Sequence, residues 1–191
     1  MRKICLPLLL LLAGYLSANA SRDTLTWSEK PLRSDDFRMT IASEEFSQSL
    51  DLDDHTTLEG YIYSGIHFSY QQIGKDIYCE VTAYMVPTES WLRDPEDDAT
   101  LEHEQAHFDI TEIYARRLRR DLSRVKTAQE AKKLMQSNFK AMQAEQKRFD
   151  KNHKNECGVH PLWQEKIDSE LKALAAWSTP TVVAESASSR K

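Results

Sequence analysis

The chain has 191 residues, of which 40% are hydrophobic and 29% are charged, and it contains only 5 glycines. This length and composition are typical of one soluble, helix-rich domain with possible tails and enough apolar residues to build a core. The 30 acidic residues outnumber the 25 basic ones, so the formal net charge is −5, which argues against a nucleic-acid partner.

The chain begins with the pattern of a secretory signal peptide. Arg2 and Lys3 form the basic region, residues 5–16 form the apolar region, and residues 18–20 read Ala-Asn-Ala, a small-residue cleavage site. The apolar run is too short to span a membrane, and no later stretch approaches that length. We therefore expect cleavage after Ala20 and a secreted or periplasmic protein with no stable membrane anchor. Loss of the two basic residues leaves 23 basic against 30 acidic residues, a net charge of −7.

The cysteine content fits this compartment. Cleavage removes Cys5 and leaves two cysteines, Cys79 and Cys157. An even pair in an oxidising compartment predicts one disulfide, which would tie the loop around Cys157 to the strand around Cys79. The alternative is a pair of buried thiols.

Period-two alternation in the middle of the chain predicts an antiparallel hairpin. Residues 58–71 and 77–86 alternate in this way and are rich in aromatic and β-branched residues. Gly-Lys-Asp at residues 74–76 is a turn sequence between them. Residues 25–27 are interpreted as a further short strand.

Three helices are predicted after the hairpin, at residues 96–125, 127–150 and 161–177. Acidic residues precede the first helix and suit its N-terminus, and a Thr-Ala-Gln-Glu capping box opens the second. Residues 179–191 are small and polar, so we expect a disordered tail there. The predicted organisation is a signal peptide over residues 1–20, one domain over 21–178, and the tail.

The first of these helices carries a His-Glu-x-x-His motif at His103, Glu104 and His107. Two histidines four residues apart lie on one face of a helix, so both imidazoles can reach a single metal ion. Glu104 lies about 100° further round, where its carboxylate can contact a water on the metal without being a ligand. Zinc lowers the pKa of its water and a carboxylate takes the proton, so the motif predicts a zinc hydrolase.

The competing interpretation of the motif is a pair of solvent-exposed histidines on a charged helix. The face that carries them continues into an apolar stripe, which argues for burial: Ile110, Tyr114 and Leu118. Glu112 is nine residues after His103, which on an unbroken helix turns it about 180° away from the metal. We therefore interpret Glu112 and Arg116 as a structural ion pair.

A zinc hydrolase needs a third protein ligand beside the open position for water. The predicted loop at 151–162 holds His153, the first choice, and His160, the second. Asp150 and Glu156 are weaker candidates. Either histidine is equally well interpreted as a surface residue of the loop.

The helix segment Leu101-Glu102-His103-Glu104-Gln105-Ala106-His107-Phe108-Asp109-Ile110 is the most specific part of a wider pattern. Weaker matches lie at Trp27, Pro31-Leu32, Asp36-Phe37, Ser64-Gly65-Ile66, Ser90-Trp91, Glu112, Ala115 and Arg116. Over most of residues 25–168 the chain resembles a family of bacterial secreted proteins catalogued as a domain of unknown function, family 922 (DUF922). The resemblance implies a secreted zinc-dependent protease in which His103 and His107 bind the metal and Glu104 is the base.

The resemblance leaves the third ligand open. Family members often carry an aromatic-Asp-x-x-Thr-x-His-Gly pattern after the second helix, and Phe149-Asp150 begins it here. His153 then stands where the pattern has threonine, and Asn155 stands where it has histidine. A small local shift would make His153 the equivalent ligand.

These observations predict an α+β, zincin-like domain, with a small antiparallel sheet followed by an active-site helix and backing helices. The predicted function is a secreted metallopeptidase that holds Zn²⁺ on His103, His107 and His153 and uses Glu104 as general base on a peptide or protein substrate. One competing hypothesis is a non-catalytic module that binds metal or a partner on the same scaffold. The other is a structural periplasmic protein whose motif is accidental. The substrate and the oligomeric state stay open.

Overall fold

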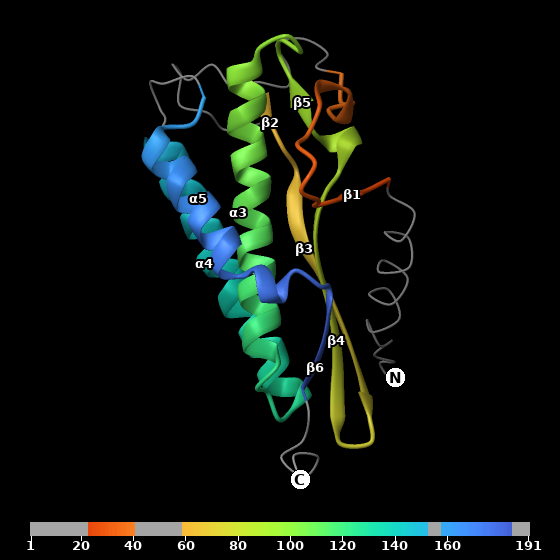
Figure 1. Ribbon diagram of the computed structural model, residues 1–191. Coiled ribbons are helices and arrows are strands. Elements are labelled where there is room, and N and C mark those ends of the chain that lie inside the picture. The colour runs from red at the N-terminus through yellow and green to blue at the C-terminus, as the bar shows by residue number, and fades with distance from the viewer. Residues whose placement is uncertain (1–22, 41–58, 153–157, 185–191) are drawn as a thin grey trace, which may run out of the picture.

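The computed structural model describes residues 23–40, 59–152 and 158–184, so the signal-peptide prediction lies outside the described residues. Figure 1 shows an α+β arrangement in which a long central helix lies between an antiparallel sheet and two further helices. The helices are α3 (Asp98–Leu122), α4 (Ala128–Asn152) and α5 (Pro161–Ala173). The strands are β1 (Leu25–Thr26), β2 (Gly60–Tyr61), β3 (Ser64–Ile73), β4 (Asp76–Met85), β5 (Trp91–Leu92) and β6 (Thr181–Ala184). Short 3₁₀ helices lie at Ser34–Asp36, Pro87–Glu89 and Ala175–Trp177.

The main sheet is built on the predicted hairpin. β3 pairs with β4 in antiparallel register from Ser64↔Met85 to Ile73↔Asp76, and Gly74 supplies the positive φ of the turn. The other edge of β4 pairs with β1 near the C-terminal end of β4 and with β6 near the N-terminal end of β4. β4 is therefore the central strand of the sheet. β2 and β5 form a separate two-stranded sheet.

Burial follows the period-two pattern of β4. One face of this strand is buried and belongs to the core cluster that includes Leu118 and Leu122 of α3: Ile77, Cys79, Val81, Ala83 and Met85. A second cluster lies among α3, α4 and α5 and includes Ile110, Phe149 and Ile167. α3 is therefore buried on two sides, which agrees with the wide apolar arc predicted for it.

The helix boundaries differ slightly from those predicted. α3 begins at Asp98, after Asp97, whose carboxylate accepts a hydrogen bond from the N–H of Ala99. α5 ends at Ala173, before a short 3₁₀ turn, where the sequence predicted a helix to residue 177. No helix in the described ranges is long and apolar enough to cross a bilayer.

The prediction of a disordered tail from residue 179 was wrong at its start. Residues 181–184 form β6, which pairs with Ile77–Glu80 of β4. Val182 and Ala184 are buried against the core, while Thr181 and Val183 face outward. Without β6, this edge of β4 would leave backbone N–H and C=O groups unpaired. The four residues of β6 supply the hydrogen-bond partners. Residues 185–191 lie outside the described part of the chain.

The predicted structural role of Glu112 is confirmed. Its carboxylate is 3% exposed and accepts hydrogen bonds from Arg116 Nε at 2.8 Å and Arg119 Nη1 at 2.9 Å. Arg119 also donates to the carbonyl oxygens of Val81 and Trp177, which joins α3 to the sheet and to the C-terminal segment. This network lies on the side of α3 that faces away from His103.

Candidate metal centre

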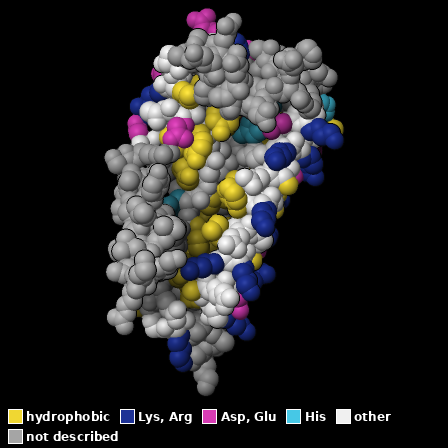
Figure 2. Space-filling model, turned by 180° about the vertical axis from the view of Figure 1, so that it is seen from behind, with side chains coloured by type: hydrophobic (Ala, Val, Ile, Leu, Met, Phe, Trp, Pro, Cys, Tyr) yellow, Lys and Arg dark blue, Asp and Glu magenta, His cyan; other side chains and the backbone are white. Residues whose placement is uncertain are grey.

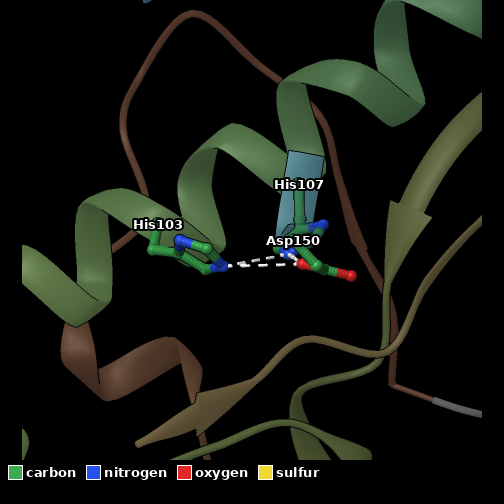
Figure 3. Close-up of side chains that lie close together, drawn as sticks. All are labelled: His103, His107 and Asp150. Carbon is green, nitrogen blue, oxygen red and sulfur yellow. Dashed lines mark hydrogen bonds and ion pairs between the residues drawn. The ribbon is translucent and has the colours of Figure 1, made fainter. Parts of the chain in front are cut away.

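Three side chains from two helices converge at one point. His103 and His107 project from α3 toward Asp150, which comes from the last turn of α4 (Figure 3). His107 Nε2 lies 2.8 Å from Asp150 Oδ1, His103 Nε2 lies 3.7 Å from the same oxygen, and the two Nε2 atoms are 3.2 Å apart. Within the described residues these are the only three such groups whose ligand atoms gather within 4.8 Å of one another.

These separations fit a zinc ion. With Zn–N and Zn–O distances of about 2.0–2.2 Å and tetrahedral angles, two ligand atoms on one ion lie about 3.3–3.6 Å apart. Of the three observed separations, 2.8 and 3.2 Å lie just below that range and 3.7 Å lies just above it. Two imidazoles and one carboxylate are also a donor set that zinc accepts in hydrolases.

Packing explains why the imidazoles converge. The ring of Phe149, which is fully buried, lies 4.7 Å from the His103 ring centroid and 4.9 Å from that of His107. Trp163 of α5 packs edge-on against the other side of Phe149. Phe149 precedes Asp150 in the chain, so the same contact that restrains both histidines also sets the position of the carboxylate.

Gln146 determines which nitrogen of His107 faces the cluster. Its Nε2 donates to the carbonyl oxygen of His107 at 2.9 Å and to Thr111 Oγ1 at 3.2 Å. The amide oxygen of Gln146 must therefore be the atom that faces His107 Nδ1, so Nδ1 carries the proton. The lone pair of Nε2 then points toward Asp150 and His103, as a metal ligand requires.

We expect Gln146→Leu to weaken zinc binding by about 10- to 100-fold, the usual cost of removing the partner that orients a ligand imidazole. The dissociation constant would be measured by competition with a zinc chelator. Gln143→Leu is the matched control, because Gln143 is exposed on the same helix. Equal affinities in the Gln146→Leu variant and the wild type would contradict the orienting role.

Asp150 and His107 shift each other's pKa values. Burial by itself raises the pKa of Asp150, but its hydrogen bonds to His103 and His107 more than offset this and hold that pKa well below its usual range. Burial also lowers the pKa of His107, and the hydrogen bond to Asp150 and the charges of Glu104 and Asp150 reverse the effect, so the net pKa is raised. Without a metal, the cluster therefore stabilises an imidazolium–carboxylate pair.

We expect the rise in Tm caused by zinc to be larger at about pH 8 than at about pH 5.5. In the metal-free protein, the pKa of His107 is raised above its unfolded value of about 6.5. Protonated His107 therefore stabilises the fold fully below the unfolded pKa, and this stabilisation is lost as the pH rises through the folded pKa. Protons therefore compete with zinc most strongly at low pH. The measurement is thermal unfolding with and without zinc at each pH; an equal zinc effect at both would contradict this account.

Glu104 is buried beside the cluster. Its side chain lies against the two-stranded sheet, where it accepts a hydrogen bond from the N–H of Ile62, and the residue is 5% exposed. Burial raises the pKa of Glu104, against the opposing effects of the charges of His107 and His103. A carboxylate whose pKa is moved toward neutrality is better suited to take and return a proton.

Gly60 in β2 leaves the space that Glu104 occupies. A Cβ atom at this position would lie 2.7 Å from Thr100 Cγ2 and 3.0 Å from Glu104 Oε1. We expect Gly60→Ala to lower the free energy of unfolding by about 1–3 kcal/mol, as overpacking usually does. Thr100→Ser removes Cγ2 but keeps the hydroxyl that bonds Asp97, so it should recover part of the loss. Urea unfolding of both single variants and the double variant measures this; strictly additive effects would contradict the contact.

Asp109, which lies in the most specific segment of the family resemblance, has a structural role. Its Oδ1 accepts hydrogen bonds from Trp27 Nε1 at 2.7 Å and from Gln105 Nε2 at 2.8 Å. Gln105 Oε1 in turn accepts from the N–H of Leu32 at 2.7 Å. These bonds fasten the N-terminal segment to the side of α3 opposite the cluster, and they involve Trp27 and Leu32, two of the weaker positions in the family resemblance.

The predicted third ligands have different outcomes. His153, the first choice, and Glu156 lie outside the described residues. His160, the second choice, caps the N-terminus of α5, where its Nδ1 accepts from the N–H of Leu162 at 3.2 Å. Asp150, ranked lower from the sequence, is the residue found beside the histidines.

A further prediction is the disulfide between Cys79 and Cys157. Cys79 is buried as a free thiol in the core between the sheet and α3. Cys157 lies outside the described residues, and Gly158 lies near Ala99 at the other end of α3. The arrangement gives no support to the predicted disulfide, which stays a prediction.

Sequence reasoning missed Gln146 and Gly60. The available signal for Gln146 was its spacing from Asp150, which puts both residues on one face of the second predicted helix. Gly60 had no local signal, because its neighbour Thr100 is 40 positions away in the chain.

Comparison with known proteins gave one match. The model of a family described as "Bacterial protein of unknown function (DUF922)" matches residues 88–158, just over a third of the chain. This segment contains α3, α4 and all three residues of the cluster. No curated protein and no solved structure matched the chain.

Proposed function

We propose a function from the site itself, because the family model that matches residues 88–158 is described as a protein of unknown function: a secreted, zinc-dependent metallopeptidase with a zincin-like arrangement. One observation carries the proposal. A buried carboxylate, that of Glu104, lies next to a His103–His107–Asp150 cluster whose spacing fits zinc. A metal site with a base nearby is what hydrolysis of an amide requires.

The donor count favours a catalytic over a structural zinc site. Structural sites have four protein ligands, whereas catalytic sites have three and keep one position for water or substrate. Three donors gather here, and the side chains of Asp150 and His103 are 53% and 22% exposed. The cluster is thus accessible from solvent, and the buried ring of Phe149 packs against both of its histidines.

In the proposed reaction, zinc held by the three residues would polarise the scissile carbonyl and lower the pKa of a water. Glu104 would accept a proton from that water as its oxygen adds to the carbonyl carbon, and would return the proton to the leaving amine nitrogen as the C–N bond breaks. Gln146 holds His107 in the tautomer that presents Nε2, and Phe149 restrains both imidazole rings. Asp150 replaces His153 as the proposed third ligand.

The zincin-like description is supported by the order of elements. A small antiparallel sheet precedes the helix that bears the motif, and α4 and α5 pack against that helix (Figure 1). The carboxylate ligand comes from the next helix in the chain, a long way from the motif in sequence.

The test uses chain 21–191 purified without chelators. We expect about one zinc per chain by elemental analysis and cleavage of a peptide library, with the cleavage lost after chelator treatment and restored by added zinc. Absence of bound metal after incubation with zinc would reject the proposal. Zinc binding without cleavage would favour the competing hypothesis of a non-catalytic module on the same scaffold.

A further inference from the structure

An apolar strip runs between β3 and α4 on the face shown in Figure 2, where hydrophobic side chains form a band beside a row of Lys and Arg. The strip consists of Ile66, Phe68 and Tyr70 on β3 and of Met135 and Phe139 on α4. Phe139 is 43% exposed and Tyr70 is 37% exposed, and the other three are partly buried. Large apolar side chains gathered on a surface in this way usually mark a binding site.

The strip leads to the candidate metal centre. Phe139, Gln146 and Asp150 lie on one face of α4, spaced seven and four residues apart. On the strand side, Ser64 begins β3, and its hydroxyl lies 3.0 Å from that of Thr111, which Gln146 also contacts. The strip is therefore continuous with the residues around His107.

The border of the strip is positively charged although the chain as a whole is acidic. α4 contains six basic and three acidic residues, while the chain has a net charge of −5. Lys140 and Lys147 are exposed and form no ion pair with any residue that the structure describes. At the far end of the strip, Lys132 Nζ lies 5.6 Å from the centre of the Tyr70 ring.

We propose that the β3–α4 strip is the substrate groove of this protein and that it binds an extended peptide segment with apolar and acidic side chains. The apolar side chains lie on the strip, and the acidic ones pair with Lys140 and Lys147. This inference rests on the proposed protease function and gives its substrate class.

The dimensions of α4 specify where the apolar anchor lies. Phe139 and Asp150 are eleven residues apart on the helix, about 16 Å at 1.5 Å per residue. An extended peptide rises about 3.3 Å per residue, so the side chain that contacts Phe139 lies about five residues from the bond to be cleaved.

The test measures binding separately from cleavage. The zinc-loaded Glu104→Gln variant is titrated into three fluorescent ten-residue peptides and followed by anisotropy. The peptides are apolar with acidic residues, apolar with lysines in place of the acids, and polar with the same acids. We expect the first to bind tightest. Phe139→Ser and the double change Lys140→Glu/Lys147→Glu, each placed in the Glu104→Gln background, should weaken its binding by about tenfold or more.

The matched control is Lys75→Glu/Lys172→Glu, which changes the net charge equally but lies on the hairpin turn and on α5. It should leave binding of the first peptide within about twofold. Equal weakening by the two double changes, or equal binding of the acidic and basic peptides, would overturn the proposal. Binding to vesicles of anionic lipid in place of any peptide would also overturn it. Peptide binding at the strip in a protein whose wild type cleaves nothing would uphold the groove and reject the protease.

Discussion

Replacement of Glu104 by Gln is expected to lower the rate of peptide cleavage by about 10²- to 10⁴-fold, the usual contribution of a general base. The amide has the shape of the carboxylate but cannot accept the proton of the attacking water. Because Glu104 is not among the three clustered donors, zinc content should stay at the wild-type value. Burial already raises the pKa of this carboxyl, so the neutral amide should also be tolerated by the fold.

Glu102→Gln is the control for this change. Glu102 is exposed on the same helix, two residues earlier, so the substitution removes the same charge without touching the buried site. We expect it to leave both zinc content and the cleavage rate unchanged. Wild-type activity in the Glu104→Gln variant, with zinc bound, would remove Glu104 from the mechanism.

Replacement of Asp150 by Ala is expected to reduce zinc affinity by more than about 100-fold, beyond the loss caused by removing an orienting partner. The carboxylate is the one anionic donor in the cluster, and it lies 2.8 Å from His107 Nε2. Isothermal titration with zinc, or chelator competition, measures the affinity. Circular dichroism of the metal-free variant checks that the helices remain.

Two histidine variants complete this experiment. His160→Ala should leave zinc affinity unchanged, since its ring caps α5. His153→Ala distinguishes the two candidates for third ligand directly. Full zinc affinity in Asp150→Ala together with a loss in His153→Ala would reject Asp150 and return the role to His153.

The exposure of Asp150 also bears on how metal reaches the site. Its side chain is 53% exposed, whereas those of His103 and His107 are 22% and 14% exposed. An incoming ion therefore meets the carboxylate first, and the depressed pKa of Asp150 keeps that carboxylate charged through the whole neutral range.

The sequence by itself determined the features that depend on near neighbours in the chain. The hairpin follows from alternation with a two-residue period, and the side of α3 that bears the histidines follows from their spacing of four. The same helical geometry turned Glu112 away from the cluster and paired it with Arg116. The family resemblance was also correct over the segment that the DUF922 model matches.

Tertiary structure alone decided which residues gather around His103 and His107. Asp150 lies beside His107 where α4 packs against α3, and the neighbouring ring of Phe149 contacts both histidines and Trp163. The position of Gly60 against Thr100, and the pairing of β6 with β4, are likewise long-range contacts. Loop position favoured His153 from the sequence, and His153 lies outside the described residues, so its role as a ligand stays a prediction; the proximity of Asp150 depends on a distance between atoms of two helices. Between helices that distance depends on packing, which local spacing does not encode.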